Sequence, residues 1–168
     1  MTAPHTDTPL QTAIFAGGCF WGVEYYMKQI PGVSLVESGY TGGHKDFPTY
    51  EEVKQHTTGH AEAVRVWFDP QKVSYETLAK RFFEIHDPCQ PDGQGYDIGP
   101  QYRSEIFYAN EEQRATAQHL IDILRAKGYP VVTRLTPATT FWPAEDYHQD
   151  YFERHGGAPD CHRYVKRF

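Results

Sequence analysis

The sequence predicts an α+β fold, a two-layer α/β sandwich of the ferredoxin-like plait type with a mixed sheet and an irregular C-terminal tail. Two observations lead to this prediction. Short apolar segments with the two-residue period of strands are interleaved with segments in which apolar residues recur every three or four positions, as in helices. The resulting order is strand, helix, strand, strand, helix, strand, helix, strand, which fits such a sandwich better than a doubly wound parallel sheet.

The first half of the chain predicts three strands and one clear helix. Residues 11–17 (QTAIFAG) are apolar, as in a strand, and they lead through a Gly-Gly pair into a helical pattern that Pro31 stops. Residues 32–43 predict a second strand that ends in a glycine turn, and residues 60–70 predict a third with a period of two. Between them, residues 47–59 predict a short helical or irregular excursion.

The second half predicts two amphipathic helices and two further strands. Ser74 is a good N-cap for a helix whose apolar stripe comprises Tyr75, Leu78, Ala79, Phe82 and Phe83. Residues 86–102 then form a long loop, of a length typical of functional loops. Asn110 with Gln113 opens another helix like a capping box. The pattern is completed by strands at 103–109 and 131–136 and a short helix at 144–156.

Length, composition and charge limit the number of domains and the classes of partner that the protein can have. A chain of 168 residues can bury a core of its own, so we expect a single domain over 1–168, with a disordered leader at 1–10 and a mobile tail at 156–168 that carries Cys161. The formal net charge of −6 gives no electrostatic case for nucleic acid or an anionic membrane. No apolar run has the length of a membrane span. We expect a monomer.

The three cysteines, Cys19, Cys89 and Cys161, form an odd set with long separations, which does not suit a disulfide framework. Because the leader also lacks the features of a secretion signal, we expect a reducing compartment and a cytoplasmic protein. The sequence has nine histidines but no CxxC pair and no HExxH motif, and adjacent Cys161 and His162 are poorly spaced for one ion. We therefore expect no metal and no other cofactor.

Cys19 is the best-placed candidate nucleophile. It stands at the predicted start of a helix, where backbone N–H groups and the helix dipole favour the thiolate. Gly17 and Gly18 allow a tight turn that leaves the sulfur uncrowded. The alternative is a small buried hydrophobic residue, as most cysteines are. Phe20 and Trp21 either fill the core or, beside a nucleophile, wall an apolar pocket for a small uncharged group such as a methyl on sulfur.

Glu62 opens a strand whose other inward positions are apolar. A carboxyl that faces a dry pocket has a raised pKa and can act as a general acid. The alternative is an exposed glutamate on an edge strand. Asp97, Tyr50 and Tyr102 are weak candidates when each is taken alone, since they equally fit a turn-forming aspartate and two partly buried rings.

Seven motifs resemble those of the A-type peptide methionine sulfoxide reductases: GGCFWG, GYTGG, PTYEEV, TGHAEAV, HDP, QG-D-G-QYRS and AEDYHQDY. They occur in the family's order between about residues 13 and 155. The resemblance implies an enzyme that reduces the S-epimer of methionine sulfoxide, free or in proteins. It also implies roles for individual residues. Cys19 attacks the sulfoxide sulfur as a thiolate, and Glu62 protonates the oxygen. The substrate-binding set is Tyr50 and Tyr102 on the oxygen, Asp97 on the polar side, and Phe20 and Trp21 at the methyl group.

The resemblance also implies how the nucleophile is regenerated. Reduction leaves Cys19 as a sulfenic acid, which condenses readily with a nearby thiol. Many relatives use a cysteine in the tail, where Cys161 stands, to form a disulfide that thioredoxin reduces. Cys89 replaces the usual threonine after HDP and is an alternative resolving thiol. Tyr96 replaces a small amide beside Asp97 and leaves the arrangement there open.

A function from another class remains as the alternative, a non-catalytic redox sensor or binding module that signals through a Cys19–Cys161 disulfide. The presence of Glu62, Tyr50 and Tyr102 together argues against it, because a sensor needs thiols but no acid aimed at an oxygen.

Overall fold

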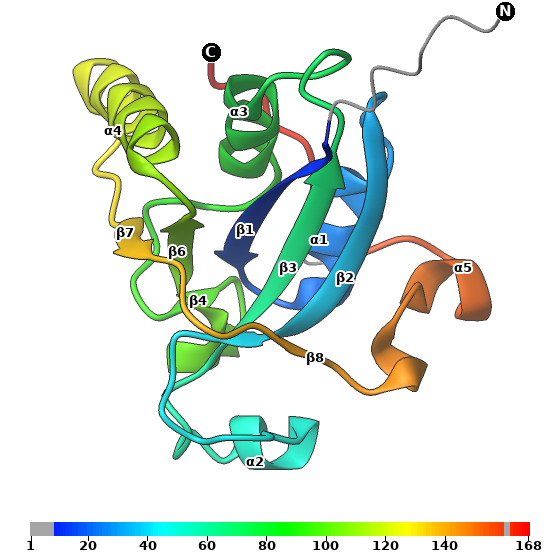
Figure 1. The fold of residues 1–168 in the computed structure, drawn as a ribbon. Coiled ribbons are helices and arrows are strands. Elements are labelled where there is room, and N and C mark those ends of the chain that lie inside the picture. The colour runs from blue at the N-terminus through cyan, green and yellow to red at the C-terminus, as the bar shows by residue number, and fades with distance from the viewer. Residues whose placement is uncertain (1–8, 160–161) are drawn as a thin grey trace, which may run out of the picture.

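The computed structural model describes residues 9–159 and 162–168. A six-stranded sheet forms its centre (Figure 1). The strands stand in the order β7-β6-β1-β3-β2-β8. β6 and β7 are parallel and the other neighbouring pairs of this sheet are antiparallel, so the sheet is mixed, as predicted. The strands are β1 Gln11–Gly17, β2 Val33–Thr41, β3 Ala61–Phe68, β6 Ser104–Tyr108, β7 Arg134–Pro137 and β8 Trp142–Pro143.

The central strands and two helices have the connectivity of a ferredoxin-like plait. Helix α1 (Phe20–Met27) joins β1 to β2, and helix α3 (Tyr75–Ile85) leads from β3 towards β6. Each helix connects two strands that have a third strand between them, β3 in the first case and β1 in the second. This is the split β-α-β arrangement, and it confirms the predicted fold class.

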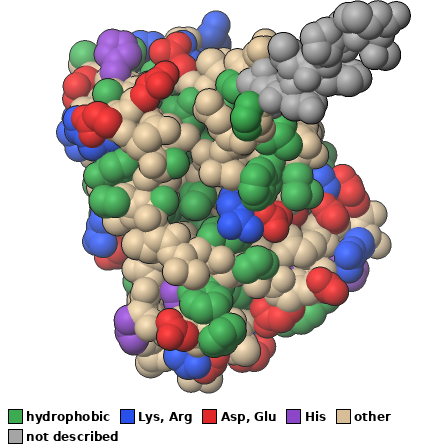
Figure 2. Space-filling model, in the orientation of Figure 1, with side chains coloured by type: hydrophobic (Ala, Val, Ile, Leu, Met, Phe, Trp, Pro, Cys, Tyr) green, Lys and Arg blue, Asp and Glu red, His purple; other side chains and the backbone are tan. Residues whose placement is uncertain are grey.

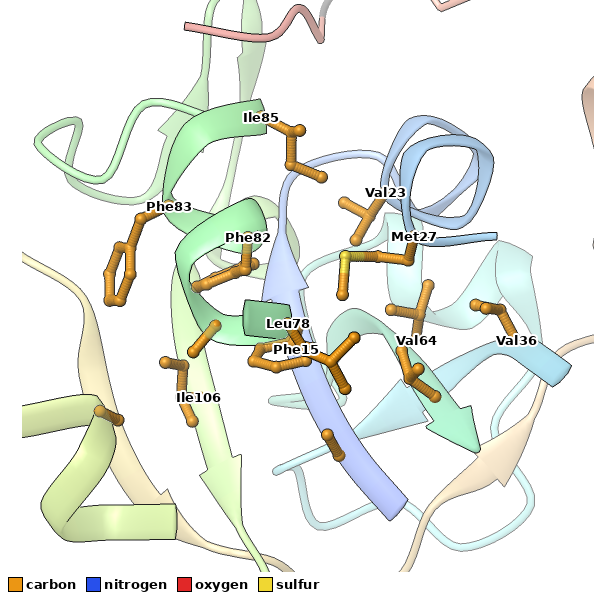
Figure 3. Packing of buried hydrophobic residues seen from close by; sticks show 14 of the residues in the cluster. Phe15, Val23, Met27, Val36, Val64, Leu78, Phe82, Phe83, Ile85 and Ile106 are labelled. Carbon is orange, nitrogen blue, oxygen red and sulfur yellow. The ribbon is translucent and has the colours of Figure 1, made fainter. Parts of the chain in front are cut away.

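The main core lies between the sheet and a layer formed by α1, α3 and α4 (Glu111–Ala126). In Figure 3, side chains from strands and helices converge on it. Burial of each such large apolar side chain stabilises the fold by about 1.5–3 kcal/mol. The labelled members include Phe15, Val64 and Ile106 from the strands and Val23, Met27, Leu78 and Phe82 from the helices.

A smaller core covers the opposite face of the sheet. Because side chains alternate along a strand, the residues between those of the main core point to this second face. The segment that runs from β7 to β8 crosses the sheet there and adds Phe141 (Figure 1). β1 and β3 are thus covered on both faces. The members of this cluster are Ile14, Ala16, Ala61, Ala63, Phe107 and Phe141.

Local capping signals in the sequence are confirmed at two helices. The Ser74 hydroxyl accepts a hydrogen bond from Thr77 N, and the Asn110 side chain accepts one from Gln113 N. The capping box predicted at Asn110 is only half formed. The Gln113 side chain accepts from Ala109 N and not from the backbone N–H of Asn110. A complete capping box occurs instead at the short helix α2 (Tyr50–Lys54), where Thr49 and Glu52 cap each other.

Three segments differ in detail from the predictions. Helix α1 ends at Met27, and the chain then continues in i→i+3 turns as far as Ile30. The predicted helix at 144–156 is a 3-10 turn, Asp146–His148, followed by α5 (Tyr151–His155), because Asp150 has a left-handed backbone with φ 54°. The loop at 86–102 contains a small hairpin of β4 (Gly93–Gln94) and β5 (Asp97–Ile98) and a 3-10 turn, Pro100–Tyr102.

The face shown in Figure 2 carries acidic and basic side chains interspersed with apolar ones. Within the described part of the chain, no helix combines the length and the apolar character that a membrane crossing requires.

Candidate active site

Cys19 lies in the connection between β1 and α1, at the N-cap position of the helix. Gly18 precedes it with φ 93°, a left-handed backbone that a residue with a side chain rarely adopts. The carbonyl of Cys19 accepts from Gly22 N and Val23 N, which begins the helix immediately after the cysteine. The half-buried thiol therefore stands at the positive end of the helix dipole, where a thiolate is favoured.

Glu62 points from β3 to the same side as α1. Its Oε1 accepts a hydrogen bond from Phe20 N at 3.2 Å, so it contacts the first residue of the helix that Cys19 caps. The side chain is 1% exposed, and Oε2 has no hydrogen-bond partner among the described residues. Burial, supplemented by the charge of Asp97, raises the pKa of Glu62 to about 8 against the opposing effect of the Phe20 N–H. The carboxyl is therefore largely protonated at neutral pH.

The hydroxyls of two tyrosines interact electrostatically with Glu62 and Cys19. Tyr50 is the first residue of α2, and Tyr102 closes the 3-10 turn before β6. Burial, followed by the charge of Glu62, raises the pKa of both hydroxyls, and the charge of Cys19 acts in the same direction. Both groups therefore stay protonated and can donate hydrogen bonds.

A cavity of about 210 Å³ brings most of the predicted site residues together. Glu62 and Phe20 are not among its lining residues; they lie buried next to it, joined by their hydrogen bond. Tyr96, which is 75% exposed, stands at the rim beside Asp97. The described lining comprises Cys19, Trp21, Gly22, Tyr50, Tyr96, Asp97, Tyr102, Phe152 and Pro159.

Aromatic rings form the apolar side of the site. The Trp21 ring stacks on Tyr151 with a centroid distance of 3.8 Å, and its Nε1 donates to His148 Nδ1 at 3.0 Å. Phe20 packs behind, with ring centroids 6.2 Å from Tyr50 and 5.3 Å from His148. The orientation of Trp21 is thus fixed on its face and at its edge.

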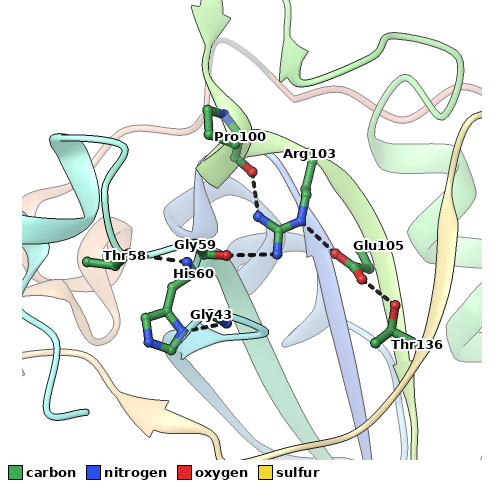
Figure 4. A network of polar contacts seen from close by, with 8 residues as sticks. All are labelled: Gly43, Thr58, Gly59, His60, Pro100, Arg103, Glu105 and Thr136. Carbon is green, nitrogen blue, oxygen red and sulfur yellow. Dashed lines mark hydrogen bonds and ion pairs between the residues drawn. The ribbon is translucent and has the colours of Figure 1, made fainter. Parts of the chain in front are cut away.

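Arg103 ties together the two chain segments that present Tyr102 and Glu62 (Figure 4). Its Nη1 donates to Pro100 O at 2.9 Å and its Nη2 to Gly59 O at 3.1 Å, while Nε pairs with Glu105 at 2.6 Å. Glu105 in turn accepts from the Thr136 hydroxyl. This buried network fixes the turn before Tyr102 relative to the turn before β3.

The other two cysteines differ from Cys19. Cys89 is half-buried in the loop after α3, where burial and then the charge of Asp87 raise its thiol pKa. Cys161 lies outside the described residues. Its chain neighbour His162 is 3% exposed, and its Nε2 donates to Gly17 O at 2.7 Å. A Cβ added at Gly22 would stand 2.3 Å from His162 Nδ1, so this imidazole packs directly on α1.

Several residues that support the site were not predicted from the sequence. Glu145 accepts from Tyr40 Oη at 2.8 Å and from Tyr50 N at 3.0 Å, and it thereby connects the C-terminal region to α2. His148 holds Trp21, and His162 packs on the glycines beside Cys19. His148 and Trp21 each lie in a matched motif, but the sequence did not indicate that these two side chains, 127 residues apart, would be hydrogen-bonded. Among the described residues, no group of three or more potential ligands is placed to hold a metal ion.

An α+β protein in which a helix N-terminus holds a half-buried cysteine beside a buried carboxyl has the arrangement of a cysteine-dependent enzyme. A family model described as peptide methionine sulfoxide reductase matches residues 11–167. The peptide methionine sulfoxide reductase MsrA of Acinetobacter baumannii (strain AYE) is 52% identical over 152 residues, which cover 90% of this chain and 88% of that protein. The chain therefore belongs to the peptide methionine sulfoxide reductase family, which confirms the resemblance of the motifs and the prediction of an enzyme.

Solved structures share the fold of this chain. The crystal structure of Mxr1 from Saccharomyces cerevisiae in reduced form has a TM-score of 0.86 at 28% identity and covers 99% of this chain and 97% of its own. A structure of Mxr1 in complex with Trx2 shares the fold, with a TM-score of 0.63 at 21% identity, over 97% of this chain and 95% of that one.

Proposed function

We propose that this chain reduces the S-epimer of methionine sulfoxide, free or within proteins, to methionine. The observation that carries the proposal is the placement of two groups at the start of α1. Cys19, at the helix N-terminus, lines the cavity, and the next residue, Phe20, donates its N–H to the buried and largely protonated carboxyl of Glu62. The choice of epimer rests on the resemblance of the motifs.

The reaction needs both groups because a sulfoxide oxygen leaves poorly until it is protonated. The Cys19 thiolate attacks the sulfur, and Glu62 transfers its proton to the oxygen. The oxygen is protonated as an S–S bond forms between Cys19 and the substrate. The hydroxyl then passes to the cysteine sulfur, the S–S and S–O bonds to the substrate sulfur break, and methionine departs. The sulfoxide is reduced by two electrons, and the thiol is oxidised to a sulfenic acid.

The remaining lining residues orient the substrate. Tyr50 and Tyr102 keep their protons and donate hydrogen bonds to the sulfoxide oxygen, since the pKa of each hydroxyl is raised. Asp97 organises the polar side of the cavity. The methyl group packs against Trp21, and Phe20 supports that wall from behind.

Regeneration of the thiol falls to Cys161 in this proposal. Its thiolate attacks the sulfenic sulfur of Cys19, water leaves, and a disulfide results, which thioredoxin reduces by exchange. The proposal is supported by His162, the residue that follows Cys161, which hydrogen-bonds to Gly17 O and packs on Gly22 close to Cys19. Mxr1 has been solved with Trx2. Cys89 is the weaker candidate, because its raised pKa disfavours the attacking thiolate. We further propose that the protein is a cytoplasmic monomer and that it repairs oxidised proteins.

The test is a single-turnover measurement of methionine formation from each pure epimer, with the resulting disulfide mapped by mass spectrometry. We expect about one methionine per protein from the S-epimer and a Cys19–Cys161 disulfide. Cys19→Ser abolishes the reaction. Cys161→Ser permits one turnover and then stalls with thioredoxin, whereas the matched control Cys89→Ser keeps full turnover.

Continued turnover of Cys161→Ser with thioredoxin would remove the resolving role of Cys161 and leave the reductase proposal intact. Disulfide formation on oxidation without any methionine produced would instead identify the redox sensor.

A further inference from the structure

A second cavity of about 190 Å³ adjoins the catalytic one. The two share a wall, because Trp21 and Phe152 line both. The second cavity is otherwise built on the outer side of α1 and the start of α5. Its remaining lining residues are Glu24, Tyr25, Lys28, Gln29, Asp150 and Glu153.

Glu24 is the buried polar group of this cavity. The residue is 1% exposed, and its Oε1 accepts a hydrogen bond from Asp150 N at 3.0 Å. Its Oε2 has no hydrogen-bond partner among the described residues, although a buried carboxyl oxygen ordinarily has one. The cavity therefore offers an unused acceptor for a ligand that donates a hydrogen bond.

The charges around this acceptor favour a cation. Lys28 pairs with both Asp150 and Glu153, so two carboxylates share one ammonium group before Glu24 is counted. The rings of Tyr25 and Phe152 meet edge to face with centroids 5.6 Å apart, and they supply an apolar surface beside the charged groups. An apolar stem with a donor at its tip matches this combination, as in lysine and arginine side chains.

We propose that this adjoining cavity is a second substrate subsite, which binds the side chain of a residue next to methionine sulfoxide in a peptide and prefers lysine or arginine there. The inference rests on the proposed function, since it assumes that the sulfoxide occupies the neighbouring cavity. Consecutive Cα atoms are 3.8 Å apart, so side chains of adjacent residues can enter cavities on either side of one indole ring. A glutamate in that position would meet three carboxyl groups and one lysine.

The experiment compares blocked pentapeptides that carry S-methionine sulfoxide at the centre and differ in one flanking residue. Lysine, glutamine, norleucine and glutamate are placed in turn directly before or directly after the sulfoxide. Methionine formation is followed with dithiothreitol as the reductant, so that the tail cysteine is not needed. We expect kcat/KM for the lysine peptide to exceed that for the glutamate peptide by about fivefold at one of the two positions, which corresponds to the upper range for a partly exposed ion pair.

Variants separate the cavity from general charge effects. Glu24→Gln replaces the buried carboxyl with a neutral amide, and Gln29→Lys places a competing cation at the exposed edge of the cavity. In each variant, kcat/KM for the lysine peptide should exceed that for the glutamate peptide by less than about twofold. Glu76→Gln, on the exposed side of α3, is the matched control and should keep the ratio. Free methionine sulfoxide should be reduced equally by all four proteins because it has no flanking side chain.

The outcomes are distinguishable. Equal rates for lysine and glutamate peptides in the unaltered protein would overturn the subsite, as would a ratio that survives in both Glu24→Gln and Gln29→Lys. Absence of methionine from every substrate would overturn the proposed function itself. Should Glu24→Gln fail to fold, Gln29→Lys decides the matter, because its side chain is at the surface.

Discussion

Glu24 and Glu62 are two buried carboxyls beside the same helix, and their surroundings differ. Each is 1% exposed, accepts one backbone N–H through Oε1 and has an Oε2 without a hydrogen-bond partner among the described residues. Burial is the main cause of both raised pKa values, about 7 for Glu24 and about 8 for Glu62. The charge of Glu62 raises the pKa of the Tyr50 and Tyr102 hydroxyls, whereas Glu24 has Lys28 and Asp150 as charged neighbours.

The difference teaches that a raised pKa does not by itself identify a general acid. Both carboxyls hold protons near neutral pH, but Glu62 alone of the two contacts the residue that follows Cys19 in the chain. Position relative to the nucleophile therefore supports Glu62, not Glu24, as the acid in the proposed reaction. Glu24 has the binding role that we propose for the second cavity.

The largest expected effect separates the two carboxyls directly. Glu62→Gln should slow single-turnover methionine formation by about 10²–10⁴-fold, the usual contribution of a general acid. Glu24→Gln should change the rate on free methionine sulfoxide by less than about twofold, because it touches no reacting atom. Rapid-quench measurement at pH 7 with saturating substrate checks both. Similar losses in the two variants would show that the comparison is mistaken.

The pH profile should separate them next. An acid must be protonated to donate, so the single-turnover rate should fall as pH rises through about 8, approaching tenfold per unit above it. Glu24→Gln should keep this falling limb, and Glu62→Gln should lose it. Rates between pH 6 and 10 supply the test; a limb that persists in Glu62→Gln would belong to another group.

The tyrosines should give a smaller effect. Tyr50→Phe and Tyr102→Phe each remove one of the proposed hydrogen bonds to the sulfoxide oxygen, and each should lower the single-turnover rate about tenfold. Because the two hydroxyls serve one oxygen, the double variant should lose less than the product of the single losses. A strictly multiplicative loss would indicate independent roles.

Stability should show the smallest effect. A folded-state pKa raised above the unfolded value means that the folded protein binds more protons, so stability falls as pH rises between about 4.5 and the folded pKa. Glu24→Gln removes one contributor, and its loss of Tm between pH 5 and pH 8 should be smaller than that of the unaltered protein by about 2–4 °C. Calorimetry at the two pH values measures this; Glu76→Gln should show no such reduction.

The sequence predicted those features of the fold that depend on neighbours in the chain. Ser74 and Asn110 cap their helices through residues three positions away. Short apolar segments bounded by turn residues, with a clear period of two in the third, predicted β1, β2, β3 and β6. β8 was missed because two residues are too few to show a period, and its pairing with β2 depends on a long-range contact. The 3-10 turn and α5 are separated at Gln149 and Asp150. Asp150 has a left-handed backbone, and Gln149 hydrogen-bonds to the Ser38 backbone on β2, a contact that no local pattern encodes.

The candidate site was predictable to a similar extent. Placement at a helix start pointed to Cys19, and the matched motifs pointed to Glu62, Tyr50, Asp97 and Tyr102. Neither indicated that Phe20 and Glu62 would lie buried behind the cavity rather than in its lining. Contacts such as Trp21 with His148 join residues 127 positions apart, and no local pattern encodes them.

Gly22 is a helix-interior glycine whose missing side chain leaves room for the ring of His162. Alanine there would strengthen the isolated helix by about 1 kcal/mol, yet its methyl group would collide with the imidazole. Gly22→Ala should therefore not stabilise the protein, because the gain in helix propensity would be offset by displacement of His162 and of the C-terminal residues that pack with it.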